Sequence, residues 1–195
     1  NPVGRQGEVV EADYHIIHGI KTRLQNTIRC VREIPINVEE VVFSPIAAAQ
    51  VMLKREHKDR GSLLIDIGGG VTDYEMYTGG SVAQSGCIGV GGDHITNDIS
   101  ILLKISQEDS ENLKKSLNQT ETIFDGENKE NYQEDPHNLS NQVIFARVDE
   151  IIKLNLADEY FNTFLNNKEN CILIFIGDGS KILNKNSIYL EEKFD

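Results

Sequence analysis

The chain has 195 residues and a formal net charge of −12 at pH 7. Typical domains have roughly 100 to 200 residues, so we expect one complete domain and part of another. The acidic excess argues against a nucleic-acid-binding protein, because affinity for a phosphate backbone depends on clustered lysine and arginine. A bound nucleotide remains compatible with this charge, since backbone N–H groups can hold phosphates.

Cysteine usage and hydropathy indicate a cytoplasmic protein. The three cysteines, Cys30, Cys87 and Cys171, are odd in number and form no CxxC pair, so neither a disulfide framework nor a zinc site is supported. No signal sequence opens the chain, and no apolar run approaches the ~18 residues of a membrane span. The first residue is Asn1 rather than methionine, and we interpret the chain as a fragment.

The expected elements alternate between helices and strands, which favours an α/β fold. Apolar residues three and four apart predict the helices, and short apolar runs bounded by glycine predict the strands. In chain order we expect a helix over 16–31, a strand over 38–43, a helix over 44–53, strands over 62–67, 71–77 and 81–88, helices over 93–103 and 106–117, a polar acidic loop over 118–140, a helix over 144–164 and a strand over 171–176. Asp93 is the expected cap of the helix that follows it.

The most informative stretch is DIGGGVTD at residues 66–73, where a buried strand ends at three glycines and a second strand begins. Gly68, Gly69 and Gly70 can aim consecutive N–H groups at phosphate oxygens. Asp66 can hold a hydrated Mg²⁺, and Thr72 can add a hydroxyl donor.

A plain hairpin turn is the alternative interpretation of three glycines. Two features favour a phosphate site instead. Acidic residues flank the turn on both strands, and a second glycine turn, Gly177-Asp178-Gly179, follows another buried strand.

DIGGGVTD resembles the second phosphate-binding loop of the actin, heat-shock chaperone and sugar-kinase superfamily. Within it, the segments PIAAA (45–49), YTGG (77–80) and VGGDHITNDI (90–99) are similar to the FtsA family of bacterial cell-division proteins. The resemblance implies an actin-like, ribonuclease H-like fold with a mixed sheet and flanking helices. It implies that residues 1–57 form the tail of a first domain with the interdomain helix. Residues 58–195 would form the second domain, with a small helical subdomain at about 106–166.

The resemblance also implies a cleft for ATP and Mg²⁺. Gly68, Gly69 and Gly70 would meet the β- and γ-phosphates, with Asp66 on the metal side. Gly177 and Gly179 match the glycine turn beside the adenosine. Lys114, in a segment similar to the helix that contacts adenosine, is a candidate contact, although a solvated helix charge is an equally good interpretation.

Three departures from the superfamily pattern limit this expectation. Asp178 stands where a third glycine is usual, and a carboxylate there would repel a phosphate unless it points away. Ser44 stands where hydrolytic relatives place a carboxylate or amide, so we expect weak hydrolysis and leave the catalytic residues unassigned. The superfamily's first phosphate loop is not found upstream of Asp66, which we attribute to truncation.

Three functional hypotheses follow. The first is an ATP-binding cell-division protein that links FtsZ-like filaments to the inner membrane, assembles into filaments itself and lies at the division site on the cytoplasmic face. Its membrane contact would come from a C-terminal helix that is not present in this chain. The alternatives are a small-metabolite kinase of the same superfamily and a nucleotide-free scaffold.

Overall fold

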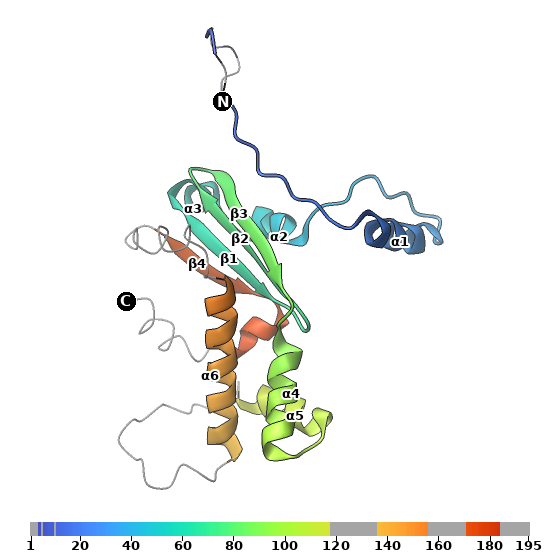
Figure 1. Cartoon of the computed structure of the whole chain (residues 1–195), viewed down its shortest axis with the longest axis vertical. Coiled ribbons are helices and arrows are strands. Elements are labelled where there is room, and N and C mark those ends of the chain that lie inside the picture. The colour runs from blue at the N-terminus through green and yellow to red at the C-terminus, as the bar shows by residue number, and fades with distance from the viewer. Residues whose placement is uncertain (1–3, 5, 10, 118–135, 156–170, 184–195) are drawn as a thin grey trace. The chain divides into compact units, whose positions relative to one another are not determined.

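The computed structural model describes residues 4, 6–9, 11–117, 136–155 and 171–183, which are drawn as ribbon in Figure 1. The chain divides into two compact units, Asn1–Phe43 and Ser44–Asp195. Among the described helices, none is both long and apolar enough to cross a membrane.

The first unit has one helix, α1 (Lys21–Arg32), with no buried residue. It begins five residues later than predicted, because Gly19 precedes it and glycine is costly inside a helix. The predicted strand over 38–43 is wrong: these residues up to Phe43 have no regular structure. A strand needs a hydrogen-bonded neighbour, and the described sheet takes all its strands from the second unit.

The second unit is built on a four-stranded mixed sheet, which confirms the predicted fold class. Its strands follow the order β3 (Ser81–Ile88), β2 (Thr72–Thr78), β1 (Ser62–Ile67) and β4 (Ile172–Ile176). β2 is antiparallel to both neighbours, whereas β4 runs parallel to β1. β1 is central, and five of its six residues are buried. This burial explains its nearly continuous apolar sequence.

Helices cover both faces of this sheet. Leu63, Ile65 and Ile67 of β1 pack with residues of α4 (Gly92–Leu103) and α6 (Pro136–Asn155), while Leu64 packs with α2 (Ser44–Met52). Successive residues of a strand face opposite sides, so these two clusters lie on opposite faces. Between α4 and α6 the sequence adds α5 (Gln107–Leu117), and Figure 1 shows all three helices extending beyond one end of the sheet.

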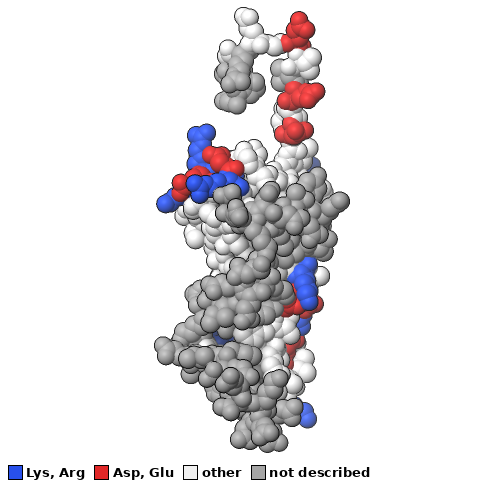
Figure 2. All heavy atoms as spheres, turned by 90° about the vertical axis from the view of Figure 1, so that its left-hand side faces the viewer, with Lys and Arg blue, Asp and Glu red and all other residues white. Residues whose placement is uncertain are grey.

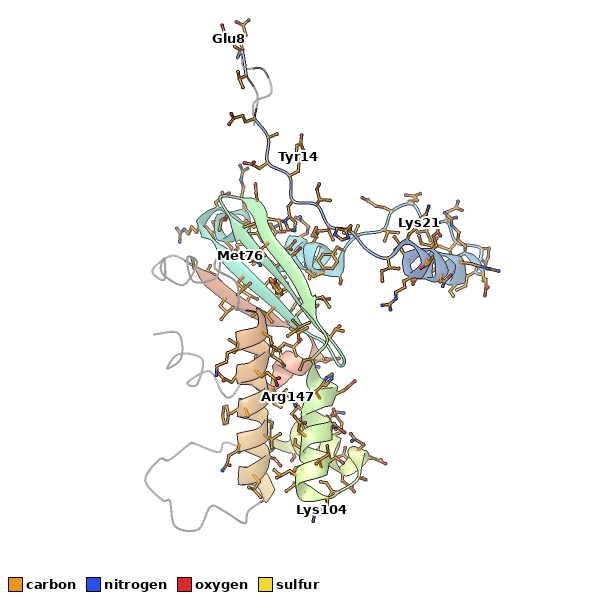
Figure 3. The ribbon with its side chains drawn as sticks, viewed as in Figure 1. Glu8, Tyr14, Lys21, Met76, Lys104 and Arg147 are labelled. Carbon is orange, nitrogen blue, oxygen red and sulfur yellow. The ribbon has the colours of Figure 1, made fainter. Side chains whose placement is uncertain are left out.

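An ion pair joins two of these helices. Arg147 on α6 donates to the Asp98 carboxylate on α4, at 2.6 and 2.8 Å. Figure 3 shows its side chain between the two helices.

The last long helix is more extensive at its start than predicted. α6 begins at Pro136, inside the segment predicted to be a loop. Proline suits the first turn of a helix, and Ser140 is fully buried, so tertiary packing supports this turn. Residues 118–135, and the end of the predicted helix at 156–164, lie outside the described residues.

Two helices of the described residues were not predicted, the 3-10 helix η2 (Asp178–Leu183) and α3 (Arg55–Arg60). α3 has the sequence REHKDR, which lacks apolar periodicity, and it ends at Gly61 with a φ of 116°. Figure 2 shows blue and red atoms lying together in parts of the described surface on the face that it draws.

Candidate functional site: a glycine-lined turn at the end of the sheet

The glycine turn between β1 and β2 is closed by one hydrogen bond, from the Gly68 N–H to the Val71 carbonyl at 2.9 Å. Gly69 and Gly70 lie at its exposed tip. Within the described residues, their N–H groups donate to no protein acceptor. The turn therefore presents two free backbone donors next to each other.

The carbonyl groups of the same turn contact the start of α4. The Gly92 N–H donates to the Gly68 carbonyl at 2.9 Å, and the Asp93 N–H donates to the Gly69 carbonyl at 2.8 Å. In a trans peptide the C=O and the following N–H point in opposite directions, and no cis peptide occurs among the described residues. The N–H groups of Gly69 and Gly70 therefore both point away from α4, which is the arrangement of an anion-binding nest.

Glycine at position 91 permits this contact. A Cβ atom there would lie 2.5 Å from the Gly69 carbonyl oxygen and 2.6 Å from that of Gly68. Gly91 is also the residue that precedes α4, and its N–H donates to Nδ1 of His94 at 3.1 Å. The expected cap at Asp93 is thus wrong, because Asp93 already lies in the first turn of the helix.

The second glycine turn lies at the same edge of the sheet. β4 is parallel to β1, so the carboxyl ends of the two strands meet there. Gly177 has a φ of 86°, and a Cβ atom on it would collide with the Asp66 carboxylate. A Cβ atom on Gly179 would lie 2.5 Å from Cγ2 of Ile67. The two turns predicted from sequence are therefore packed directly against each other.

Lys114 is not a solvated charge. Its side chain is 13 % exposed, and its ammonium group donates to the Gly92 carbonyl at 3.0 Å and to Oγ1 of Thr96 at 2.6 Å. It also forms a 2.6 Å ion pair with Glu111. These three partners place the lysine beside Gly92, whose contact with the turn defines the site.

Glu111 and Thr96 were missed by the sequence interpretation. Burial raises the pKa of Glu111, but hydrogen bonds from Lys114 and Thr96, with the charges of Lys114 and Lys115, lower it overall. The carboxylate is therefore held ionised. The signal for Glu111 was its spacing, three residues before Lys114 on one helix face, whereas nothing in the sequence indicates Thr96.

Two carboxylates face each other across β1 and β2. Asp66 and Asp73 are register partners, and burial together with the charge of Asp73 raises the pKa of Asp66. Asp73 also accepts a hydrogen bond from Oγ of Ser44 at 3.4 Å. A nearby dication would relieve this repulsion, and Mg²⁺ commonly takes only one or two carboxylates. The described residues contain no cluster of three or more acidic, histidine or cysteine ligands. The donor set therefore fits a hydrated Mg²⁺ that a phosphate helps to hold, rather than a site built from protein ligands alone.

Thr72 and Asp178 are placed differently from what the motif suggests. Thr72 is fully buried and donates its hydroxyl to the Val90 carbonyl at 2.7 Å, so it fixes the segment before α4. The Asp178 side chain is 91 % exposed and pairs with Lys181 at 2.6 Å, which lowers its pKa. Its charge is therefore offset by a neighbouring cation.

Comparison with known proteins identifies the family. The model of the family "Cell division protein FtsA" matches residues 63–187. This chain belongs to the FtsA family. FtsA of Bacillus subtilis (strain 168) is 38 % identical over 117 residues, which cover 60 % of this chain and 27 % of that protein. FtsA of Borreliella burgdorferi is 36 % identical over 114 residues, covering 58 % and 28 %. The match thus spans about a quarter of these relatives' length.

Solved structures confirm the actin-like fold. MreB5 of Spiroplasma citri bound to ADP superposes with a TM-score of 0.62 at 20 % identity, over 89 % of this chain and 58 % of that chain. A PilM-PilN type IV pilus biogenesis complex gives 0.62 at 15 % identity, over 86 % and 44 %. At this identity the likeness concerns the fold alone. Together with the family match, it identifies a chain of the FtsA family with an actin-like fold.

Proposed function

We propose that this FtsA-family chain carries one side of an ATP site, and that the intact protein binds ATP as a switch in cell division. One observation carries this proposal. The N–H groups of Gly69 and Gly70 lie at an exposed turn, point the same way and have no acceptor among the described residues. Such pairs of donors hold phosphate oxygens.

The neighbouring residues suit the remaining parts of a nucleotide. In this proposal Gly68, Gly69 and Gly70 cradle the terminal phosphates, and Gly177 and Gly179 allow the second turn to pack closely against the first on the adenosine side. Lys114 reaches the adenosine side after exchanging one of its present hydrogen bonds. Thr72 supports the turn through its bond to Val90. The likeness to MreB5 structures bound to ADP and AMPPNP makes a nucleotide a reasonable ligand for this fold.

Asp66 is the residue we propose for Mg²⁺. The bound ion would supply positive charge that offsets both the phosphates and the facing carboxylates. Hydrolysis is proposed to be weak, because Ser44 has only the Asp73 carboxylate as a partner and serine is a poor base.

Family membership supports a proposal for the cellular role. We propose that the intact protein links FtsZ-like filaments to the inner membrane, self-associates, and lies at the division site on the cytoplasmic face. Residues 1–57 then represent the tail of the first actin-like domain with the interdomain helix. Residues 58–195 are the second domain, with its helical subdomain at about 106–166.

The test is thermal unfolding of the protein, expressed from its complete reading frame, with and without Mg-ATP. A ligand at 100 times its Kd adds about 2.7 kcal/mol, which raises Tm by about 5 to 10 °C for chains of roughly 150 to 250 residues and by less for a longer reading frame. We expect Asp66→Ala to abolish this shift.

A matched pair at Gly70 separates binding from folding. A Cβ atom on Gly70 would meet nothing within 4 Å, so both Gly70→Ala and Gly70→Asp are expected to fold. Only Gly70→Asp places a negative charge at the phosphate position, so it alone is expected to lose the Mg-ATP shift completely. If the wild type shows no shift, or Gly70→Asp retains it, the chain is better described as a nucleotide-free scaffold.

A further inference from the structure

Glu75 is a buried carboxyl group without a hydrogen-bond partner of good geometry. It lies on β2 and has no solvent-exposed surface, and neither Oε1 nor Oε2 has a described partner at normal hydrogen-bond geometry, although the Tyr77 hydroxyl lies close enough to lower its pKa. Oγ of Ser62, on the adjacent strand, is equally buried and equally without a partner. Buried carboxylates are normally paired, because an unpaired charge in a protein interior is costly.

The position of Glu75 identifies what covers it. Its register partner on β1 is Leu64. Leu64 packs with Ala49 of α2 and with Leu53, which directly follows α2. Tyr77, two residues further on the same face of β2, belongs to the same cluster. Glu75 therefore points into the layer between the sheet and α2.

The charged groups around this layer do not neutralise the negative charge that Glu75 would carry when ionised. The charge of Lys58 on α3 lowers the pKa of Glu75, but its ammonium group donates to Gln50 of α2 at 3.1 Å and lies 4.9 Å from the Tyr77 ring centre. On the same face β1 contributes Asp66 and β2 contributes Asp73, which are also acidic. α2 has no ionisable side chain, and β3 and β4 contain no ionisable group other than a cysteine.

These surroundings favour the neutral acid. Burial raises the pKa of Glu75 more than the Tyr77 hydroxyl and the Lys58 charge lower it. Ionisation must then be accompanied by water or a cation reaching the carboxylate, which requires an element to move.

Of the two elements that supply apolar residues next to Glu75, α2 and β1, α2 is the more weakly attached. Only Pro45 and Ala49 of its nine residues are buried, and Val51 is 84 % exposed. β1 on the other side of Glu75 has five of six residues buried and two strand partners. Local opening takes place where the fewest apolar contacts are lost, which is at the helix.

We propose that Glu75 is a protonation-dependent latch: α2 packs on the sheet while this carboxyl group is neutral and is released when it ionises. The consequence extends to the glycine turn, because Ser44 at the start of α2 donates to Asp73. Release of α2 would remove this contact. The latch is a property of the fold and does not rest on nucleotide binding.

The test is hydrogen exchange of the α2 amides at residues 48–53, measured from pH 5 to pH 8 on the protein from its complete reading frame. After correction for intrinsic exchange, opening of α2 is expected to rise with pH by up to about tenfold per unit above the ordinary glutamate pKa, until the closed-state carboxyl itself titrates. Glu75→Gln, which keeps the volume and cannot ionise, is expected to remove this rise.

Two further variants keep the test decisive. Glu75→Met is similar in size and apolar, and is expected to hold α2 closed at every pH even if the amide variant folds poorly. Glu56→Gln removes an exposed carboxylate from neighbouring α3 and is expected to retain the wild-type pH dependence. The proposal is overturned if α2 opening is independent of pH in the wild type, if the dependence persists in Glu75→Gln, or if β1 amides lose protection to the same extent as those of α2.

Discussion

The contact between the glycine turn and α4 allows a sharp prediction for Gly91→Ala. The added Cβ would lie 2.5 Å from the Gly69 carbonyl oxygen, whereas real Cβ atoms essentially never approach within 3.0 Å of another heavy atom. The turn must therefore retreat by at least 0.5 Å (3.0 − 2.5). All the obstructing atoms belong to the backbone of Gly68 and Gly69, so no flexible side chain can give way.

The retreat weakens the two hydrogen bonds that join the turn to α4, at 2.9 and 2.8 Å. A typical intramolecular hydrogen bond contributes about 0.5 to 1.5 kcal/mol, so the variant is expected to lose about 1 to 3 kcal/mol. For a chain of this size the loss corresponds to a fall in Tm of roughly 2 to 12 °C. The Mg-ATP shift is expected to shrink as well, because the same peptide planes orient the free N–H groups.

The matched control is Gly89→Ala. A Cβ at Gly89 would meet nothing within 4 Å, and its φ is not positive, so its Tm is expected to change by no more than a degree or two. Differential scanning calorimetry of the two variants measures the difference. Equal stability of Gly91→Ala and Gly89→Ala would refute the close packing of the turn on α4.

Three further substitutions probe the same unit by denaturant unfolding. Lys104→Gly is expected to stabilise it by about 0.5 to 1 kcal/mol, because Lys104 ends α4 with a φ of 55°, which glycine adopts without strain. The control is Lys115→Gly at an exposed helical residue, which is expected to cost a similar amount. Stabilisation at both positions would contradict this reasoning. Ile99→Ala is expected to cost about 2 to 5 kcal/mol, since Ile99 has no exposed surface. Ile101→Ala is expected to cost less than about 0.5 kcal/mol, because Ile101 is 67 % exposed. Similar costs for the two substitutions would place the core elsewhere. Asp66→Asn is expected to stabilise the apoprotein at neutral pH. The pKa of Asp66 is raised in the folded protein, so its favourable contribution to stability is complete below its ordinary pKa of 3.8 and is lost as pH rises through the folded-state pKa. If the pH profile of stability is unchanged by the substitution, the facing carboxylates do not interact.

The sheet could be predicted from sequence because its strands carry their own signals. β1 is buried on both faces and reads as a continuous apolar run, and β2 and β3 are separated by the glycine pair Gly79-Gly80. The strand over 38–43 failed for the complementary reason. Its sequence is suitable, but a strand also needs a neighbour, which a single segment does not specify.

The residues of the site were predicted from the sequence, but the contacts between them were not. DIGGGVTD and the turn at Gly177 indicated where donors and carboxylates would gather. The role of α4 could not be predicted, because Gly91 and Gly92 reach the turn only through tertiary packing. The role of Lys114 was ambiguous for the same reason, because the burial of its side chain depends on packing against Thr96, which is 18 residues away in the sequence.

The central claim, that the N–H groups of Gly69 and Gly70 hold a phosphate, is tested most directly by NMR of protein labelled with ¹⁵N-glycine. Titration with Mg-ATP is expected to shift the Gly69 and Gly70 amide signals strongly, whereas adenosine, which has no phosphate, leaves them in place. Gly79 and Gly80, in the hairpin turn between β2 and β3, serve as internal references and are expected to stay unchanged. Unchanged Gly69 and Gly70 signals at saturating Mg-ATP, or equal shifts with adenosine, would contradict the claim.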